Sequence, residues 1–76
     1  MFRFSEFILV KVLTNSRYLL IFDKRSGDTL ALEYFDLEAI RKLLVNAHEG
    51  AFWKSALAFE SISFNKAVEI GILVEV

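Results

Sequence analysis

The order of apolar and polar positions divides the chain into short alternating runs and one segment with helical spacing. Residues 7–13, 18–23 and 29–35 are rich in β-branched and aromatic residues, and polar clusters separate them. Such runs are typical of strands, and polar clusters between them are typical of hairpin turns. We therefore expect three antiparallel strands joined as a meander.

The first expected strands are apolar on both faces. In residues 1–13, the two-residue period puts five apolar side chains on one face: Phe2, Phe4, Ile8, Val10 and Val12. The opposite face mixes apolar and polar side chains: Phe7, Leu9 and Leu13 beside Arg3, Ser5 and Lys11. Two apolar faces are typical of a strand that is covered on both sides. We therefore expect both faces of the sheet to be buried.

Residues 36–47 are the one segment with plain helical periodicity. Its apolar residues recur every three or four positions: Leu37, Ile40, Leu43, Leu44 and Ala47. Asp36 suits the N-cap, because its carboxylate can accept the free N–H groups of the first turn. Gly50 is expected to end the helix as a left-handed cap. One helix, about 10 Å across, covers roughly half of a five-stranded sheet about 20 Å wide.

The C-terminal third favours a β-hairpin. Its β-branched residues occupy every second position: Val68, Ile70, Ile72, Val74 and Val76. This alternation predicts a strand over residues 67–76, paired with residues 57–64 through a turn at Asn65 and Lys66. The alternative is a helix over residues 63–70 with Ser63 as its cap. In the strand, Gly71 would mark a bulge or a close backbone approach. Residues 51–56 stay open between a helical turn and the approach to a strand.

These elements predict a single small α+β domain over residues 1–76. Its antiparallel sheet would be a β-meander, followed by one main amphipathic helix and a C-terminal β-hairpin, a ββαββ-like order with three leading strands. Three strands followed by a helix resemble, at the level of topology, the small PqqD-like domains, which clamp leader peptides by adding a strand to an open sheet. The resemblance implies further helices, which would need the helical alternative for residues 63–70.

The composition indicates a surplus of apolar surface. Hydrophobic residues make up 55% of the chain, and it has no Cys and one His. A domain of this size buries only about 60–65% of its unfolded surface, and such domains often depend on disulfides, metals or oligomerisation. We therefore expect a homo-oligomer, with a dimer favoured, or a protein partner. The candidate interface residues are Phe52, Trp53, Ile70, Ile72, Val74 and Val76. Core packing is the alternative for Phe52 and Trp53.

No motif in the chain points to catalysis. His48 lies beside Glu49 and near Ser55 in sequence, but such a site needs convergence in space, and a surface His at a helix end is the simpler interpretation. Residues 23–28 lack the oxygen spacing of a calcium loop and are expected to form a solvated hairpin turn. Three scattered Gly residues cannot form a phosphate loop. We expect no enzymatic activity, no cofactor, no metal and no small-molecule substrate.

Charge and hydropathy narrow the expected partners. The net charge of −1 gives no general attraction to nucleic acid or to an anionic membrane, and no apolar run approaches the length of a membrane span. We expect a soluble, cytoplasmic interaction or assembly module that self-associates through apolar sheet surface. The alternative is a sheet-based regulatory protein that binds peptide or nucleic acid, either a PqqD-like peptide clamp or an inhibitor of the phage or mobile-element type.

Overall fold

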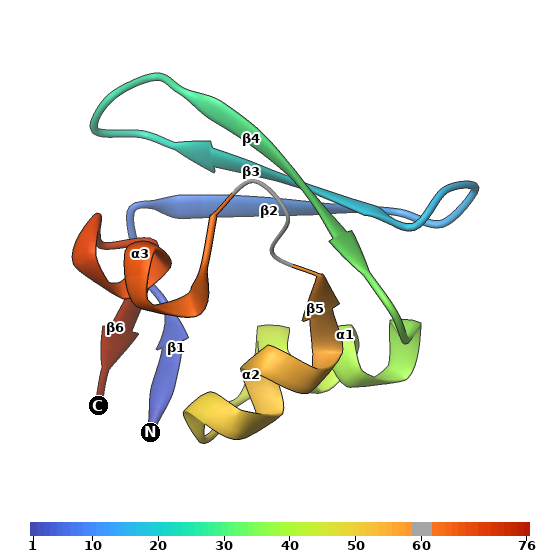
Figure 1. Cartoon of the computed structure of the whole chain (residues 1–76). Coiled ribbons are helices and arrows are strands. Elements are labelled where there is room, and N and C mark those ends of the chain that lie inside the picture. The colour runs from blue at the N-terminus through green and yellow to red at the C-terminus, as the bar shows by residue number, and fades with distance from the viewer. Residues whose placement is uncertain (59–61) are drawn as a thin grey trace.

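The computed structural model describes residues 1–58 and 62–76 (Figure 1). Within these residues the elements follow one another as β1 (Phe2–Phe4), β2 (Ile8–Leu13), β3 (Tyr18–Asp23), β4 (Thr29–Tyr34), α1 (Leu37–Val45), α2 (Gly50–Ala56), β5 (Leu57–Ala58), α3 (Phe64–Glu69) and β6 (Leu73–Glu75). The predicted α+β class is confirmed.

The predicted meander is also confirmed. Strands β2, β3 and β4 pair antiparallel, and short β5 joins β4, so the sheet order is β2-β3-β4-β5. In the register, Val10 lies opposite Ile21, and Ile21 lies opposite Leu30. These directly opposed residues share one face of the sheet, since side chains of paired residues point the same way.

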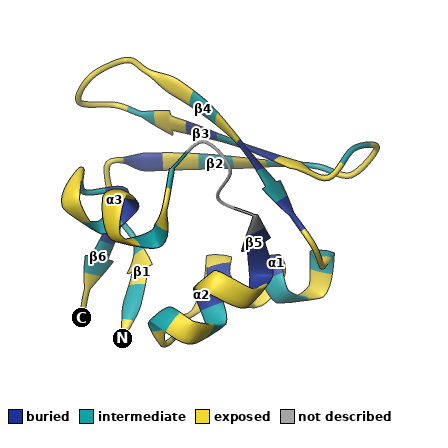
Figure 2. Ribbon diagram, viewed as in Figure 1, coloured by how far each residue is buried: buried dark blue, intermediate teal, exposed yellow. Residues whose placement is uncertain are grey.

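The helices lie on one side of this sheet, together with the β1–β6 pair (Figure 1). The core forms between them, and Leu19, Ile21 and Leu32 of the sheet are at most 1% exposed. Ile40 of α1 and Trp53 of α2 are fully buried against the same core. Figure 2 shows buried and exposed positions alternating along the strands, as the period of a strand requires.

Helix α1 begins as predicted. The carboxylate of Asp36 accepts the N–H of Glu38 at 3.1 Å. The helix ends at Val45, two residues before the expected end, with Asn46 in an extended conformation. The prediction that Gly50 is a left-handed cap is wrong, because Gly50 does not have a positive φ and instead starts α2. Its small size still serves packing, since a Cβ there would lie 3.0 Å from the ring of Phe64.

The predicted C-terminal hairpin is wrong, and the helical alternative holds for this segment. Ser63 caps α3 by accepting the N–H of Lys66 at 3.1 Å. The helix ends in a Schellman motif, in which Gly71, with a φ of 82°, donates to the carbonyl of Val68 and Ile72 donates to that of Ala67. These cap bonds outweigh the β propensity of the alternating residues. In the expected partner strand, residues 59–61 lie outside the described residues.

The last strand pairs with the first. Strand β6 runs antiparallel to β1, with Phe4 opposite Leu73 and Phe2 opposite Glu75, so the two chain ends lie side by side (Figure 1). The alternation expected through residues 1–13 is interrupted at buried Ser5, whose hydroxyl accepts the N–H of Phe7 at 3.2 Å. This turn sends β1 and β2 into different sheets.

Candidate interaction surface

The face of the meander that points away from the helices forms the candidate site. We call it the outer face and define it by nine residues: Leu9, Lys11 and Leu13 of β2, Tyr18, Leu20 and Phe22 of β3, and Thr29, Ala31 and Glu33 of β4. Leu9, Tyr18 and Phe22 are 54%, 44% and 37% exposed. Within the described residues, the helices all lie on the opposite side of the sheet (Figure 1).

The register arranges the outer face in rows across the strands. Leu9, Phe22 and Thr29 form one row, Lys11, Leu20 and Ala31 the middle row, and Leu13, Tyr18 and Glu33 the third. The apolar side chains therefore run along central β3 and on to both neighbouring strands. The two charged residues lie on the outer strands, in different rows. Neither Lys11 nor Glu33 forms an ion pair within residues 1–58 and 62–76.

The free edge of β2 borders the outer face. Strand β2 is the first strand of the sheet order, so one of its edges pairs with no strand in the described part of the chain. The other end of the order is occupied by β5, which has only two residues. The Lys11 side chain projects from the middle of β2, and a Lys on an edge strand is one way in which proteins discourage uncontrolled pairing.

Two of the candidate interface residues lie in the core. Trp53 is fully buried, and its Nε1 donates to the carbonyl of Phe2 at 3.3 Å. Its ring and the Phe4 ring pack in a T shape, with their centroids 4.7 Å apart. Ile72 is 2% exposed and follows the turn after α3. Core packing, the alternative for Trp53, therefore accounts for its position. Neither side chain contributes to the surface of this chain.

The other four candidate residues do not form one surface. Phe52 is half-buried and stacks on the ring of His48, with centroids 4.5 Å apart. Val74 is half-buried in β6. Ile70 and Val76 are exposed, but they line different hollows of the molecule. The expected C-terminal strand would have aligned these residues, and α3 separates them.

The outer face was missed as a site although the sequence carried a signal for it. The two-faced alternation of Leu9, Leu20 and Phe22 is the pattern of a strand with a second apolar face. Sequence reasoning placed this surplus mainly in the C-terminal strand. Only the position of the helices shows which face of the meander stays uncovered.

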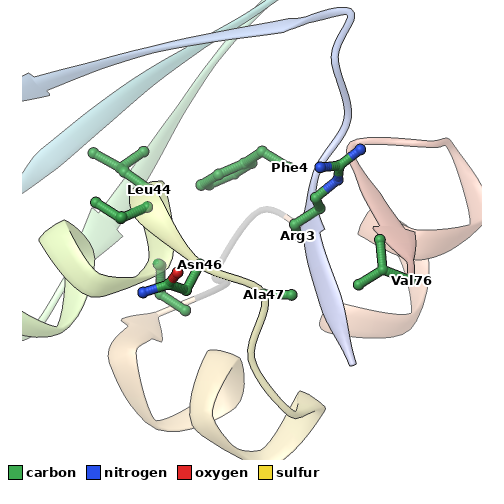
Figure 3. A pocket seen from close by; sticks show the side chains of 8 residues that line it. Arg3, Phe4, Leu44, Asn46, Ala47 and Val76 are labelled. Carbon is green, nitrogen blue, oxygen red and sulfur yellow. The ribbon is translucent and has the colours of Figure 1, made fainter.

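A hollow of about 420 Å³ lies between the end of α1 and the β1–β6 pair (Figure 3). Arg3 and Phe4 project from β1 on one side, and Leu44, Asn46 and Ala47 lie on the other. Arg3 is the one ionisable side chain among the lining residues. The hollow therefore brings together no acid–base pair.

His48, Glu49 and Ser55 do not assemble a nucleophilic site. The His48 Nε2 lies 3.2 Å from the carbonyl of Lys42 at the end of α1. The Ser55 hydroxyl donates to the carbonyl of Phe52 at 2.9 Å, within its own helix. Its proton is thus directed to the backbone and not to an imidazole. Among the described residues, no group of His, Asp and Glu side chains is arranged to hold a metal ion.

The loop after β3 connects the meander to the end of α3 through the hydrogen bonds of Arg25, and we call these contacts the Arg25 clamp. Arg25 donates from its Nη2 to a carboxylate oxygen of Asp23 at 3.0 Å and to the carbonyl of Gly71 at 3.1 Å. Its guanidinium also lies 5.3 Å from the centroid of the Phe7 ring. The hydrogen bonds from Arg25 lower the pKa of Asp23 below its ordinary value. The loop expected to be solvated therefore has a structural role through its arginine.

Comparison with known proteins identifies no relative. No protein-family model matches the chain, and no curated protein or solved structure is significantly similar to it. In the described part of the chain, no helix has both the length and the apolar character needed to cross a membrane.

Proposed function

We propose that this chain is a non-enzymatic interaction module that self-associates through its outer face. The observation that carries the proposal is the group of exposed apolar side chains on β2 and β3, in a sheet whose other face is already covered. Leu9, Tyr18 and Phe22 together expose large apolar groups on adjacent strands. Contiguous exposed apolar patches of this kind are typical of interaction sites.

The size of the outer face fits a weak complex. Three strands at about 4.8 Å spacing and six residues of about 3.3 Å give roughly 14 by 20 Å, or about 280 Å² in projection. Two such faces bury less than the roughly 1,200–2,000 Å² of stable complexes. We therefore expect a dissociation constant in the range of about 10–500 μM, equivalent to about −7 to −4.5 kcal/mol.

The test is sedimentation velocity over a concentration series from about 5 μM to about 1 mM. We expect the wild type to shift from monomer to dimer. Leu20→Glu places a charge in the middle row of the outer face and should keep the chain monomeric. Val45→Glu is the matched control, because Val45 is 77% exposed on α1, away from the outer face, and it should leave the association unchanged. A wild type that remains monomeric at every concentration would refute the proposal.

A second candidate is a peptide clamp at the free edge of β2. Two observations favour it: β2 leaves one edge without a paired strand in the described residues, and helices α2 and α3 follow α1, as the PqqD-like resemblance implies. An extended peptide that pairs with this edge would gain main-chain hydrogen bonds. The test is an NMR titration with a peptide selected from a random displayed library. Chemical-shift changes at the β2 backbone amides support the peptide clamp, whereas chemical-shift changes confined to outer-face side chains contradict it.

Nucleic acid is not proposed as the partner. Lys11 is the one cation among the nine outer-face residues, and phosphate contacts by Lys and Arg supply most of the affinity of a nucleic-acid surface.

A further inference from the structure

The two charges of the outer face select one arrangement of a dimer. This inference rests on the proposed self-association and adds its geometry. Lys11 lies on β2, in the middle row of the outer face. Glu33 lies on β4, on the other side of β3, in the third row. Neither has an ionic partner within the described residues. A charge in an apolar interface must be paired to avoid a large desolvation cost.

Two sheets that pack face to face in the aligned class keep their strands within about 30° of each other. For two identical copies related by a twofold axis, this leaves two arrangements. In the first, the axis runs parallel to β3, and β2 of one copy faces β4 of the other. In the second, the axis runs across the strands, and β2 of one copy faces β2 of the other.

The axis parallel to β3 brings opposite charges together. Lys11 of one copy then faces Ala31 of the second copy. Glu33 of the second copy lies two residues further along β4, which is about 7 Å. The sheets are about 10 Å apart, and the long flexible stem of Lys11 spans this offset. The twofold axis repeats the pair, so both outer-face cations meet both anions.

The same axis places apolar groups against apolar groups along the centre. Strand β3 faces its own copy, so Tyr18, Leu20 and Phe22 pack against the same residues of the second copy. Lys24 follows the end of β3 in the loop and lies at the rim, where solvent screens its charge.

The axis across the strands brings like charges together. With the axis through the middle row, Lys11 faces Lys11 of the second copy, and Glu33 faces Thr29. Like charges directly opposite each other in a sheet contact are destabilising. We propose that two copies pack outer face to outer face about an axis parallel to β3, with Lys11 of each copy paired to Glu33 of the other.

The test uses two charge reversals, Lys11→Glu and Glu33→Lys, measured by sedimentation as separate variants and as an equimolar mixture. Each reversal replaces two attractive pairs by two repulsive ones, so each variant alone should dimerise about tenfold more weakly than wild type. In the mixture, the introduced glutamate of one variant meets the introduced lysine of the other, and the unchanged Lys11 and Glu33 form the second pair. The mixture should therefore form a heterodimer about as tightly as the wild type forms its homodimer. Circular dichroism of each variant checks that the sheet is intact.

Three other outcomes overturn the geometry, and they separate it from the proposed function. If Leu20→Glu abolishes a wild-type dimer but neither charge reversal changes it, the outer face is the interface and the Lys11–Glu33 pairing is refuted. If Glu33→Lys has no effect and Lys11→Glu binds wild type more tightly than wild type binds itself, the axis runs across the strands. If the wild type never dimerises, the proposed function and this inference are refuted together.

Discussion

Gly71 and Gly27 allow a controlled measurement of how firmly the Arg25 clamp holds α3. Both glycines have a positive φ, 82° and 79°, so a Cβ at either position is strained. A Cβ at Gly27 would meet no atom within 4 Å, whereas a Cβ at Gly71 would lie 3.0 Å from Nη1 of Arg25. Gly27→Ala therefore carries the backbone strain alone. Gly71→Ala carries the same strain and must also displace the guanidinium.

The strain should cost about 1–2 kcal/mol for Ala at either position. With a urea m-value of about 1 kcal/mol/M for a small domain, Gly27→Ala should lower the midpoint of urea unfolding by about 1–2 M. Gly71→Ala should lower it further, because the Arg25 guanidinium must shift by about a few tenths of an ångström, which strains its hydrogen bonds to the carbonyl of Gly71 and to Asp23. The assay is urea unfolding followed by circular dichroism. Equal midpoint shifts for the two variants would refute the clamp.

A third variant isolates the contribution of the arginine. In an Arg25→Ala background, no guanidinium lies beside residue 71. In that background, Gly71→Ala should lower the free energy of unfolding by no more than Gly27→Ala does. If the excess cost of Gly71→Ala persists without Arg25, its cause lies in the Schellman turn and not in the clamp.

Three further substitutions test the core, a helix cap and the pH dependence. Trp53→Ala removes a fully buried ring and its bond to Phe2, and it should lower the free energy of unfolding by about 3–5 kcal/mol in urea titrations; a loss below about 1 kcal/mol would contradict its core position. Ser63→Ala leaves the N–H of Lys66 without its cap and should cost about 1 kcal/mol, whereas an unchanged midpoint would argue against the cap. The lowered pKa of Asp23 means that its ion pair stabilises the fold above the unfolded pKa of about 4, and that this contribution is lost as the pH falls through the lower folded pKa. Asp23→Asn should therefore have a lower melting temperature than wild type at pH 7, and this difference should shrink as the pH falls below about 4; a difference that stays constant as the pH falls would contradict the assignment.

Local signals in the N-terminal half predicted the meander and the start of α1. Polar clusters separate the three strands of the meander, and Asp36 stands one residue before an apolar stripe of helical period. Each element there depends on neighbours close in sequence, so turn chemistry and capping were sufficient. The prediction that a single helix would cover half of one face of a five-stranded sheet is wrong, because α2 and α3 join α1 on the same side of a four-stranded sheet. The apolar surface that stays uncovered is the outer face.

The C-terminal segment carried two contradictory signals. Alternating Val68 and Ile70 fit a strand, while Ser63 and Gly71 fit the start and end of a short helix. In so short a segment, periods of 2 and 3.6 are poorly distinguished, and the cap residues decided the outcome. The interface residues followed this choice, which is why Ile72 was placed on a surface and lies in the core.

The pairing of β1 with β6 could not be predicted from local pattern, and it has a consequence for folding. Phe2 lies opposite Glu75, so the contact joins residues 73 positions apart (75 minus 2). Long separations of this kind slow folding, because loop closure must precede the contact. During synthesis, the meander and α1 can form from residues already made, whereas the pairing of β1 with β6 must wait for the last strand. Until Trp53 and Phe64 are also made, the Phe4 and Phe2 rings lack the aromatic side chains that they contact in the folded chain, and apolar side chains that stay exposed during folding favour aggregation.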